Sequence, residues 1–428
     1  MLTLFGLLII LLIVVLMVTE RASPVVVLAV VPLVGALLAG FDLKQISEYF
    51  TTGIGSVVDV LVMFVFSIIF FGAMQEAGLF DPLVRFVVRI THGSVVKVTV
   101  GSAIVACIIQ VDGSGAVTAL ITVPAFLPIY KRLGMRPVLL MLMVAGSVSV
   151  MNLTPWGGPV GRAALVIGMS PNELWHQIIP AQVIGLVMLI GLAVIFGYRE
   201  KRRIAASGFR REAPSEPQAH TERIELPRLF WVNFLITALA VVLLLVDILP
   251  ISYVFILATC ATLMTNFRKP AEQMDCIKRQ APEALCLGAV VCSAAAFLGI
   301  MSGTGMIDAL AKSMAGFMPG IMLQHIHIVS GILGTPLDML TSSDSYFFGV
   351  LPVTVEIAKS HGIAPESVAA AMVIGNNVGK FLSPFAPAVW LMISLAESTF
   401  GQHIRYSFLP LWVFGTVLLL ISVAVGIV

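Results

Sequence analysis

Two short polar segments interrupt long apolar stretches of this chain, Asp-Gly-Ser-Gly at 112–115 and Thr-Ser-Ser-Asp at 341–344. Both have the composition of turns. Of the 428 residues, 59% are hydrophobic and only 11% are charged, whereas a soluble protein has about 25% charged residues. The chain is therefore expected to lie in a lipid bilayer, where irregular polar backbone is tolerated only if protein buries it or it lines a watery cavity. Paired interruptions of this kind point to the binding site of a transporter.

Apolar runs long enough to cross a bilayer, roughly 17–25 residues, occur in both halves of the chain. We expect spans at 3–19, 22–40, 57–78, 178–198, 229–248, 250–267, 284–304 and 406–428. Between them lie broken apolar stretches, at 94–130, 137–169, 324–358 and 366–397. The hydrophilic segment 199–228 is rich in Arg, Glu and Pro. It predicts a linker between a first transmembrane repeat, residues 1–198, and a second, residues 229–428.

The two halves share a residue pattern at an almost constant offset. Four residues of the first half recur 227 positions later: Gly72 as Gly299, Met74 as Met301, Gly78 as Gly305 and Asp81 as Asp308. Another four recur 228 positions later: Pro124 as Pro352, Lys131 as Lys359, Gly134 as Gly362 and Pro159 as Pro387. Chance explains poorly why one offset holds within a residue through three separated blocks, so we interpret the halves as an internal repeat.

The topology follows from counting crossings. If each polar hairpin returns to its own side and each Pro-broken stretch crosses once, each half has five crossings, and the odd number inverts the second half. The predicted fold is an all-α polytopic membrane protein with two inverted repeats, each with five crossings, one of them Pro/Gly-broken, plus one re-entrant helical hairpin. This arrangement places 20 of the 25 Lys and Arg residues on one side and three on the other. The positive-inside rule then predicts a cytoplasmic (inner) membrane protein with both termini outside and the loop 199–228 in the cytoplasm.

Arg162 and Lys380 are the two basic residues that this topology leaves away from an interface. Arg162 follows the Pro/Gly break Asn-Leu-Thr-Pro-Trp-Gly-Gly-Pro at 152–159, and Lys380 lies at the break near 379–387, within Asn-Asn-Val-Gly-Lys-Phe-Leu-Ser-Pro-Phe-Ala-Pro at 376–387. An ionisable residue inside a membrane bundle indicates function by default, and a broken helix adds N-terminal N–H groups that attract anions. The combination suits a carboxylate-bearing solute. The alternative is that Arg162 pairs with a carbonyl group or reaches an interface.

The candidate substrate-binding residues are those that line the two breaks and the two polar turns. They are Ser114, Gly115, Asn152, Thr154, Gly157, Gly158, Arg162, Ser342, Ser343, Asn377, Lys380 and Ser383.

Carboxylates mark the tips of the predicted hairpins. Asp112 and Asp344 are candidate ligands for a hard divalent cation, which prefers oxygen atoms. Asp112, Asp338 and Asp344 are candidate proton carriers. The alternative is that these residues only cap short helices, a role for which Asp and Ser are standard; capping and ligand binding are compatible.

At these residues the chain resembles the citrate–metal–proton symporter (CitMHS) family of the ion transporter superfamily, over nearly its whole length. The resemblance rests on Asp-Gly-Ser-Gly-Ala-Val-Thr at 112–118, Asn-Leu-Thr-Pro-Trp-Gly-Gly-Pro at 152–159, Thr-Ser-Ser-Asp-Ser-Tyr at 341–346 and Ser-Pro-Phe-Ala-Pro at 383–387. It implies uptake of citrate complexed with a divalent cation of the Mg²⁺ or Ca²⁺ type, coupled to protons. The related divalent anion/sodium symporters imply inverted repeats, an elevator motion and a homodimer. At 113–115 this chain has Gly-Ser-Gly, where the family pattern has a second acidic residue.

The implied cargo makes physical sense, since citrate at neutral pH carries about three negative charges and one divalent cation reduces this to about one, which lowers the cost of desolvation. The metal is then a co-substrate, and no cofactor is expected to be permanently bound. The partners are the carboxylate and the lipid bilayer; no basic patch suggests nucleic acid.

Other functions compete with this one. A sodium-coupled di- or tricarboxylate symporter or a cation/proton antiporter of the same superfamily would also use the Ser, Thr and Asn oxygens, so protons or sodium are candidate coupling ions. A passive channel fits broken helices less well than alternating access. Asp112-Gly-Ser-Gly resembles an aspartic protease loop, but such an enzyme needs two facing carboxylates, and Asp344 lies in a dissimilar context. We therefore expect a transporter and not an enzyme.

Overall fold

The computed structural model describes residues 2–19, 21–91, 94–207, 226–316 and 318–428, and every regular element in these ranges is helical. The first half contains α1 (Leu2–Val18), α2 (Pro24–Leu38), α3 (Leu43–Glu76), α4 (Asp81–Ile90), α5 (Val95–Ile109), η1 (Gln110–Asp112), α6 (Gly115–Arg132), α7 (Pro137–Met151), α8 (Gly158–Ile167) and α9 (Pro171–Ala206). The second half contains α10 (Phe230–Val246), α11 (Ile251–Asn266), α12 (Pro270–Gly303), α13 (Met306–Ala315), α14 (Gly320–Gln324), α15 (Ile326–Thr341), α16 (Ser343–Ser345), η2 (Tyr346–Val350), α17 (Leu351–Lys359), α18 (Pro365–Asn376), η3 (Gly379–Phe381), α19 (Pro387–Leu395) and α20 (Phe400–Ala424). The prediction of an all-helical fold is confirmed.

Several helices have the length and composition of membrane spans. Among the described residues, five helical segments are long and apolar enough to cross a membrane: α3, Val95–Asp112, α9, α12 and α20. Shorter apolar helices accompany them, including α1, α2, α7, α10 and α11. The chain is a multi-pass membrane protein. The number of crossings in each half stays a prediction.

The helices repeat in the same order in both halves. α3 and α12 each have 34 residues and begin 227 residues apart, whereas α7 and α18 begin 228 residues apart. α1 and α10 each have 17 residues and also begin 228 residues apart. These are the offsets at which the residue pattern repeats.

α3 and α12 pack closely against each other and run antiparallel. Gly303 of α12 lies against Tyr49 near the start of α3, whereas Gln280 near the start of α12 lies against Gly72 near the end of α3. At the crossing, Gly53 and Gly299 are in contact, and a Cβ added to Gly53 would lie 2.3 Å from the carbonyl oxygen of Ala295. Small residues allow this approach of two backbones. An inverted repeat would place equivalent helices antiparallel; the inverted repeat itself stays a prediction.

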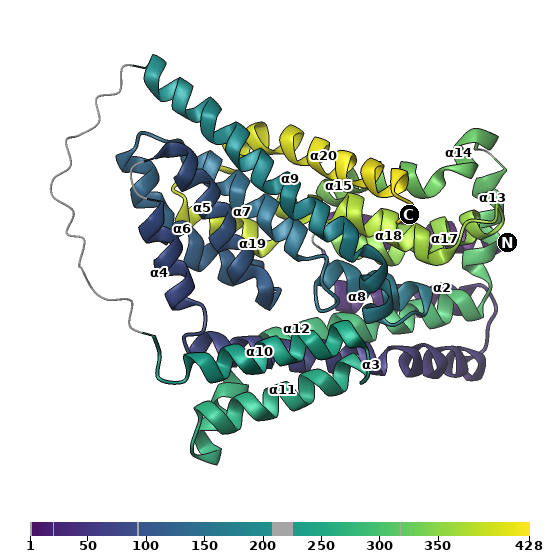
Figure 1. The fold of residues 1–428 in the computed structure, drawn as a ribbon. Helices are drawn as coiled ribbons and strands as arrows, with labels where there is room; N and C mark the ends of the chain where they lie inside the picture. The colour runs from purple at the N-terminus through teal and green to yellow at the C-terminus, as the bar shows by residue number, and fades with distance from the viewer. Residues whose placement is uncertain (1, 20, 92–93, 208–225, 317) are drawn as a thin grey trace.

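The helices form two groups (Figure 1). α10, α11, α12 and α3 lie together along the lower side of the view, and α11 and α12 both pack against α3. The hairpin of α5 and α6 and the broken stretches lie in a second group, which α9 and α20 flank along the upper side. α8 contacts both α3 and α12, so the broken stretch of the first half lies where the groups meet.

The predicted interruptions are present. η1 ends at Asp112, Gly113 follows with a left-handed φ of 79°, and α6 begins at Gly115. The second hairpin turns where α15 ends at Thr341. The broken stretches separate α7 from α8, and α18 from α19.

The predicted linker 199–228 coincides only in part with described residues. α9 continues through Ala206, so the first part of the segment is helical. Residues 208–225 lie outside the described residues. The division into two repeats and a linker stays a prediction.

Candidate functional site

The first hairpin and both broken stretches contribute to one cavity of about 310 Å³ between the two helix groups. One wall comes from the breaks and includes Asp112, Trp156, Gly158, Arg162 and Lys380. The opposite wall comes from α3 and α12 and includes Phe64, Ser67, Glu283 and Cys286. A cavity of this volume is within the usual range for small-molecule sites.

Arg162 and Lys380 converge on the same piece of backbone. A Cβ added to Gly158 would lie 2.4 Å from Arg162 Nη1 and 3.8 Å from Lys380 Nζ. Gly158 is the first residue of α8, and Pro159 follows it in the first turn, where the missing N–H of proline is no loss. Glycine at this position therefore leaves room for two cationic groups beside the N-terminus of a helix. The three features together favour an anion.

Arg162 forms an ion pair with the second hairpin. Its Nε lies 2.7 Å from Asp344 Oδ1, and the two side chains are only 12% and 17% exposed. Arg162 comes from the first half of the chain and Asp344 from the second, so this pair links the two halves. Neither Arg162 Nε nor Asp344 Oδ1 makes a hydrogen bond of good geometry within the described residues. The N–H group of Arg162 Nε can therefore donate to another acceptor, and Asp344 Oδ1 can accept from another donor.

Asp338 lies next to the turn that carries Lys380. Its Oδ2 accepts a hydrogen bond from Ser343 Oγ at 3.1 Å, and its backbone carbonyl accepts one from Ser383 Oγ at 3.0 Å. A Cβ added to Gly379 would lie 2.8 Å from Asp338 Cβ, so glycine permits this close approach. Asp338 is completely buried, and its Oδ1 has no hydrogen-bond partner within the described residues.

The first half has an uncharged counterpart of this arrangement. Gln110 and Asn152 are the positions that correspond to Asp338 and Lys380 at the offset of 228. Gln110 Nε2 donates to Asn152 Oδ1 at 2.9 Å, and Gln110 Oε1 accepts from Thr118 Oγ1 at 2.7 Å. Sequence reasoning had missed Gln110, although the offset from Asp338 was a signal that could have found it.

At the first hairpin tip, Asp112 and Ser114 act as caps. Asp112 Oδ1 accepts a hydrogen bond from the backbone N–H of Ser114 at 2.8 Å, and Ser114 Oγ accepts one from Val117 N at 3.5 Å. Asp112 also lines the cavity, so capping does not remove it from the site. Gly115 lies against the ring of Phe381, which a Cβ would approach to 2.5 Å.

The other predicted residues support the breaks and do not line the cavity. Thr154 Oγ1 donates to the carbonyl of Met151 at 3.2 Å, and Gly157 lies against the backbone of Asn152. Asn377 Nδ2 donates to the backbone carbonyl of Ser149. Ser342 has a φ of 103°, which a residue other than glycine rarely adopts, and it caps the short helix that carries Asp344.

Glu283 is a cavity residue that sequence reasoning had missed. It lies on α12, is exposed, and lines the cavity together with Asp112 and Lys380. Its nearest charged neighbours in the sequence are Lys278 and Arg279, so it looks like part of a charged helix end. In and directly beside the cavity there are thus two basic side chains, Arg162 and Lys380, and four acidic ones, Asp112, Asp338, Asp344 and Glu283.

Comparison with known proteins agrees with this architecture. The citrate transporter family (CitMHS) matches residues 9–375. The chain is 34% identical to the citrate transporter of Bacillus subtilis (strain 168), with all of both chains covered. It is 31% identical to the Mg(2+)/citrate complex secondary transporter of the same organism, with 95% of this chain and 94% of the relative covered.

A solved structure shows a similar fold. The crystal structure of the Alcanivorax borkumensis YdaH transporter, described as having an unusual topology, matches with a TM-score of 0.63 at 15% identity, and the match covers 90% of each chain. At this identity the likeness concerns the fold alone. The resemblance seen in the sequence is confirmed: the chain belongs to the citrate transporter family and is a membrane transporter, not an enzyme.

Proposed function

We propose that this transporter imports citrate, or a similar carboxylate, as a complex with a divalent metal ion of the Mg²⁺ or Ca²⁺ type, coupled to protons. The observation that carries the proposal is the charge of the site, two basic groups against four carboxyl groups. Free citrate, with about three negative charges, would be poorly compensated there, because a buried charge needs a partner. A metal complex brings its own positive charge. A relative named as a Mg(2+)/citrate complex transporter supports this choice of cargo.

Arg162, Lys380 and the start of α8 would hold free carboxylate oxygens of citrate. Gly158 at the start of α8 lies between the two cationic groups, and Gly157, Asn152 and Thr154 shape the turn before it. Arginine can bind a carboxylate in a bidentate manner. A citrate carboxylate would then replace Asp344 as the partner of Arg162.

Asp344 would be free to act on the metal once Arg162 binds citrate. Asp112 reaches the same cavity from the first hairpin, and the hydroxyls of Ser114, Ser342 and Ser343 lie in the two hairpin turns. These oxygen atoms suit a hard divalent cation. The metal ion is part of the cargo on this proposal, and citrate supplies the rest of its ligands.

The proton carrier would be one of Asp112, Asp338 and Asp344. Asp338 is our first choice, because it is completely buried and one of its oxygens has no hydrogen-bond partner within the described residues. A buried carboxylate in this situation gains from neutralisation. Ser383 and Asn377 would fix the turn around it.

Transport would follow from inverted repeats and a relative movement of the two helix groups. The antiparallel packing of α3 and α12 and the position of the cavity between the groups support this elevator-like picture. We propose an inner-membrane homodimer with both termini outside and the loop 199–228 in the cytoplasm. Three ion pairs support this orientation, because each contains a basic residue that the topology predicts on the cytoplasmic side. They are Lys131–Glu397, Arg136–Glu200 and Arg279–Glu76.

Uptake of radiolabelled citrate into proteoliposomes tests the proposal. Uptake should require Mg²⁺ or Ca²⁺, should stop when a chelator is added, and should increase with an inward proton gradient. Arg162→Ala and Lys380→Ala should abolish it, whereas Arg89→Gln, an exposed residue of α4 outside the cavity, should not. Sodium-driven uptake that is independent of metal would refute the mechanism and favour a sodium-coupled di- or tricarboxylate carrier.

A further inference from the structure

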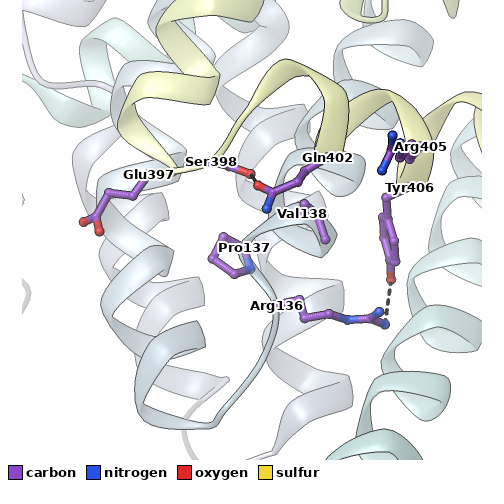
Figure 2. A pocket seen from close by; sticks show the side chains of 8 residues that line it. All are labelled: Arg136, Pro137, Val138, Glu397, Ser398, Gln402, Arg405 and Tyr406. Atoms are coloured by element: carbon purple, nitrogen blue, oxygen red, sulfur yellow. Dashed lines mark hydrogen bonds between the residues drawn. The ribbon is translucent and has the colours of Figure 1, made fainter.

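A second cavity, of about 490 Å³, lies away from the transport site, between the start of α7 and the first turns of α20. Figure 2 shows its lining side chains. Arg136 and Pro137 come from the start of α7, and Gln402, Arg405 and Tyr406 come from α20. The turn between α19 and α20 adds Glu397 and Ser398, which completes the rim.

The acceptor groups around this cavity are already in use. Gln402 Oε1 accepts hydrogen bonds from Ser398 Oγ at 2.9 Å and from the backbone N–H of Thr399 at 3.2 Å. The amide NH₂ group of Gln402 is not used in these bonds and can donate to a ligand. Glu397 forms an ion pair with Lys131 at 2.6 Å, and its carboxylate points away from the other labelled side chains in Figure 2. The acidic groups near the cavity are therefore occupied by other partners.

The donor groups, in contrast, have capacity left. Arg405 is exposed and has no hydrogen bond or ion pair to any described residue. The Tyr406 hydroxyl accepts from Arg136 Nη2 at 3.4 Å, which leaves its own proton available. Arg136 is bound to Glu200 through Nε and Nη2, and its Nη1 is not used in that pair. Arginine, amide and hydroxyl donors without acceptors favour an anion with several oxygen atoms.

The position of Arg405 on α20 indicates where the anion comes from. Large apolar side chains follow it on the same helical face, Leu409, Val413, Val417 and Leu420, and they are 60%, 49%, 39% and 48% exposed. Residues at this spacing lie above one another along a helix. In a multi-pass membrane protein such an exposed apolar stripe faces lipid, so Arg405 lies at its headgroup end, where long basic side chains meet lipid phosphates.

We propose that this cavity binds the phosphate group of an anionic phospholipid, with Arg405 and Gln402 as its principal donors and the acyl chains along the apolar stripe of α20. Tyr406 and Arg136 would complete the set of donors. Around the cavity the basic side chains outnumber the acidic ones Glu200 and Glu397, so the surrounding potential is positive; the basic residues are Lys131, Arg132, Arg136, Arg203 and Arg405. The proposal concerns a site distinct from the citrate cavity and does not depend on the transported solute.

Lipid binding to the purified, delipidated full-length protein tests this proposal. Native mass spectrometry would give the dissociation constants of phosphatidylglycerol and phosphatidylcholine, with inorganic phosphate as the free-anion probe. Arg405→Gln should weaken phosphatidylglycerol binding by about tenfold, as expected for one lost charge-assisted hydrogen bond. Gln402→Glu removes a donor and adds a negative charge, yet its carboxylate can keep the helix cap that Gln402 forms with Thr399. Arg89→Gln on α4 is the control for a simple change in surface charge.

The expected result is that wild type and Arg89→Gln bind phosphatidylglycerol more tightly than phosphatidylcholine, and that both cavity variants lose this preference. Gln402→Glu should keep the wild-type melting temperature without lipid, which separates lost binding from misfolding. Equal binding of the two lipids, or an unchanged preference in Gln402→Glu, would overturn the proposal. Displacement of phosphatidylglycerol by equimolar inorganic phosphate would overturn the lipid assignment and indicate a site for a free anion.

Discussion

Asn377 donates a side-chain hydrogen bond to the backbone carbonyl of Ser149, and the two residues are 228 positions apart, the offset at which the residue pattern of the chain recurs. Both are at most 2% exposed. The contact joins the last turn of α7 to the residue that directly follows α18, where the two breaks begin. Equivalent points of the two halves thus meet inside the protein, and the segments that carry Arg162 and Lys380 are held in a fixed relation.

Removing this contact should loosen both breaks. Asn377→Ala leaves a buried carbonyl without its donor, so we expect the free energy of unfolding to fall by about 1–3 kcal/mol, seen as a lower melting temperature in detergent. Ser149→Ala is the matched control, because it keeps the accepting backbone carbonyl and loses only the hydrogen bond that the Ser149 hydroxyl donates to the carbonyl of Ala145. If the two variants have the same melting temperature, the contact contributes nothing of its own.

The neutral pair Gln110–Asn152 and the charged residues Asp338 and Lys380, which lie 228 positions further on, allow an exchange between the two halves of the chain. Gln110→Asp alone would bury a carboxylate beside an amide, and we expect destabilisation of about 3–5 kcal/mol, typical of a buried charge without its partner. Adding Asn152→Lys should restore much of this loss. A double-mutant cycle on thermal stability measures the coupling, and strictly additive effects would show that an aspartate at 110 and a lysine at 152 do not pair.

The interruptions of the helices could be predicted from sequence, whereas the contacts across the cavity could not. Pro, Gly and Asp end helices through local backbone chemistry, so the breaks at 112–115 and 152–159 were visible in the chain. The pairing of Arg162 with Asp344 depends on how separate helices pack, and no local pattern specifies it. The position of Glu283 in the cavity wall also depends on how α12 packs against the rest of the protein, so the sequence around Glu283 does not predict it.

Three helices, α3, α9 and α12, are also longer than the apolar runs that predicted them, and α3 shows why. The expected span 57–78 is the second part of α3, which begins at Leu43. Its first turns are polar, so a hydropathy argument overlooks them. Asp42 and Gln45 form a capping box at this end, a local signal that could have placed the helix start.

Asp344→Asn should change the preferred cargo. The substitution removes the partner of Arg162 and one negative charge beside the cavity. Free citrate should then bind several-fold more tightly, because fewer carboxylates repel it, whereas metal-dependent uptake should fall by about tenfold or more if Asp344 is a metal ligand. Competition by citrate with and without chelator measures both effects. Asp308→Asn, at the exposed start of α13, is the control. Unchanged metal dependence would contradict the assigned role of Asp344.

Glu283→Gln tests whether the wall formed by α12 contributes to charge selection. Glu283 is exposed and lines the same cavity as Lys380 and Asp112. Neutralising it should leave thermal stability unchanged, but it should lower the apparent KM for citrate at low metal concentration by roughly two- to tenfold, since an interaction of about 1 kcal/mol is expected for charges separated by water. The effect should diminish at high ionic strength, because salt screens exposed charges. Glu272→Gln, on the same helix but outside the cavity, should change neither quantity. A KM effect of Glu283→Gln that is insensitive to both salt and metal would show that Glu283 acts through local structure and not through its charge.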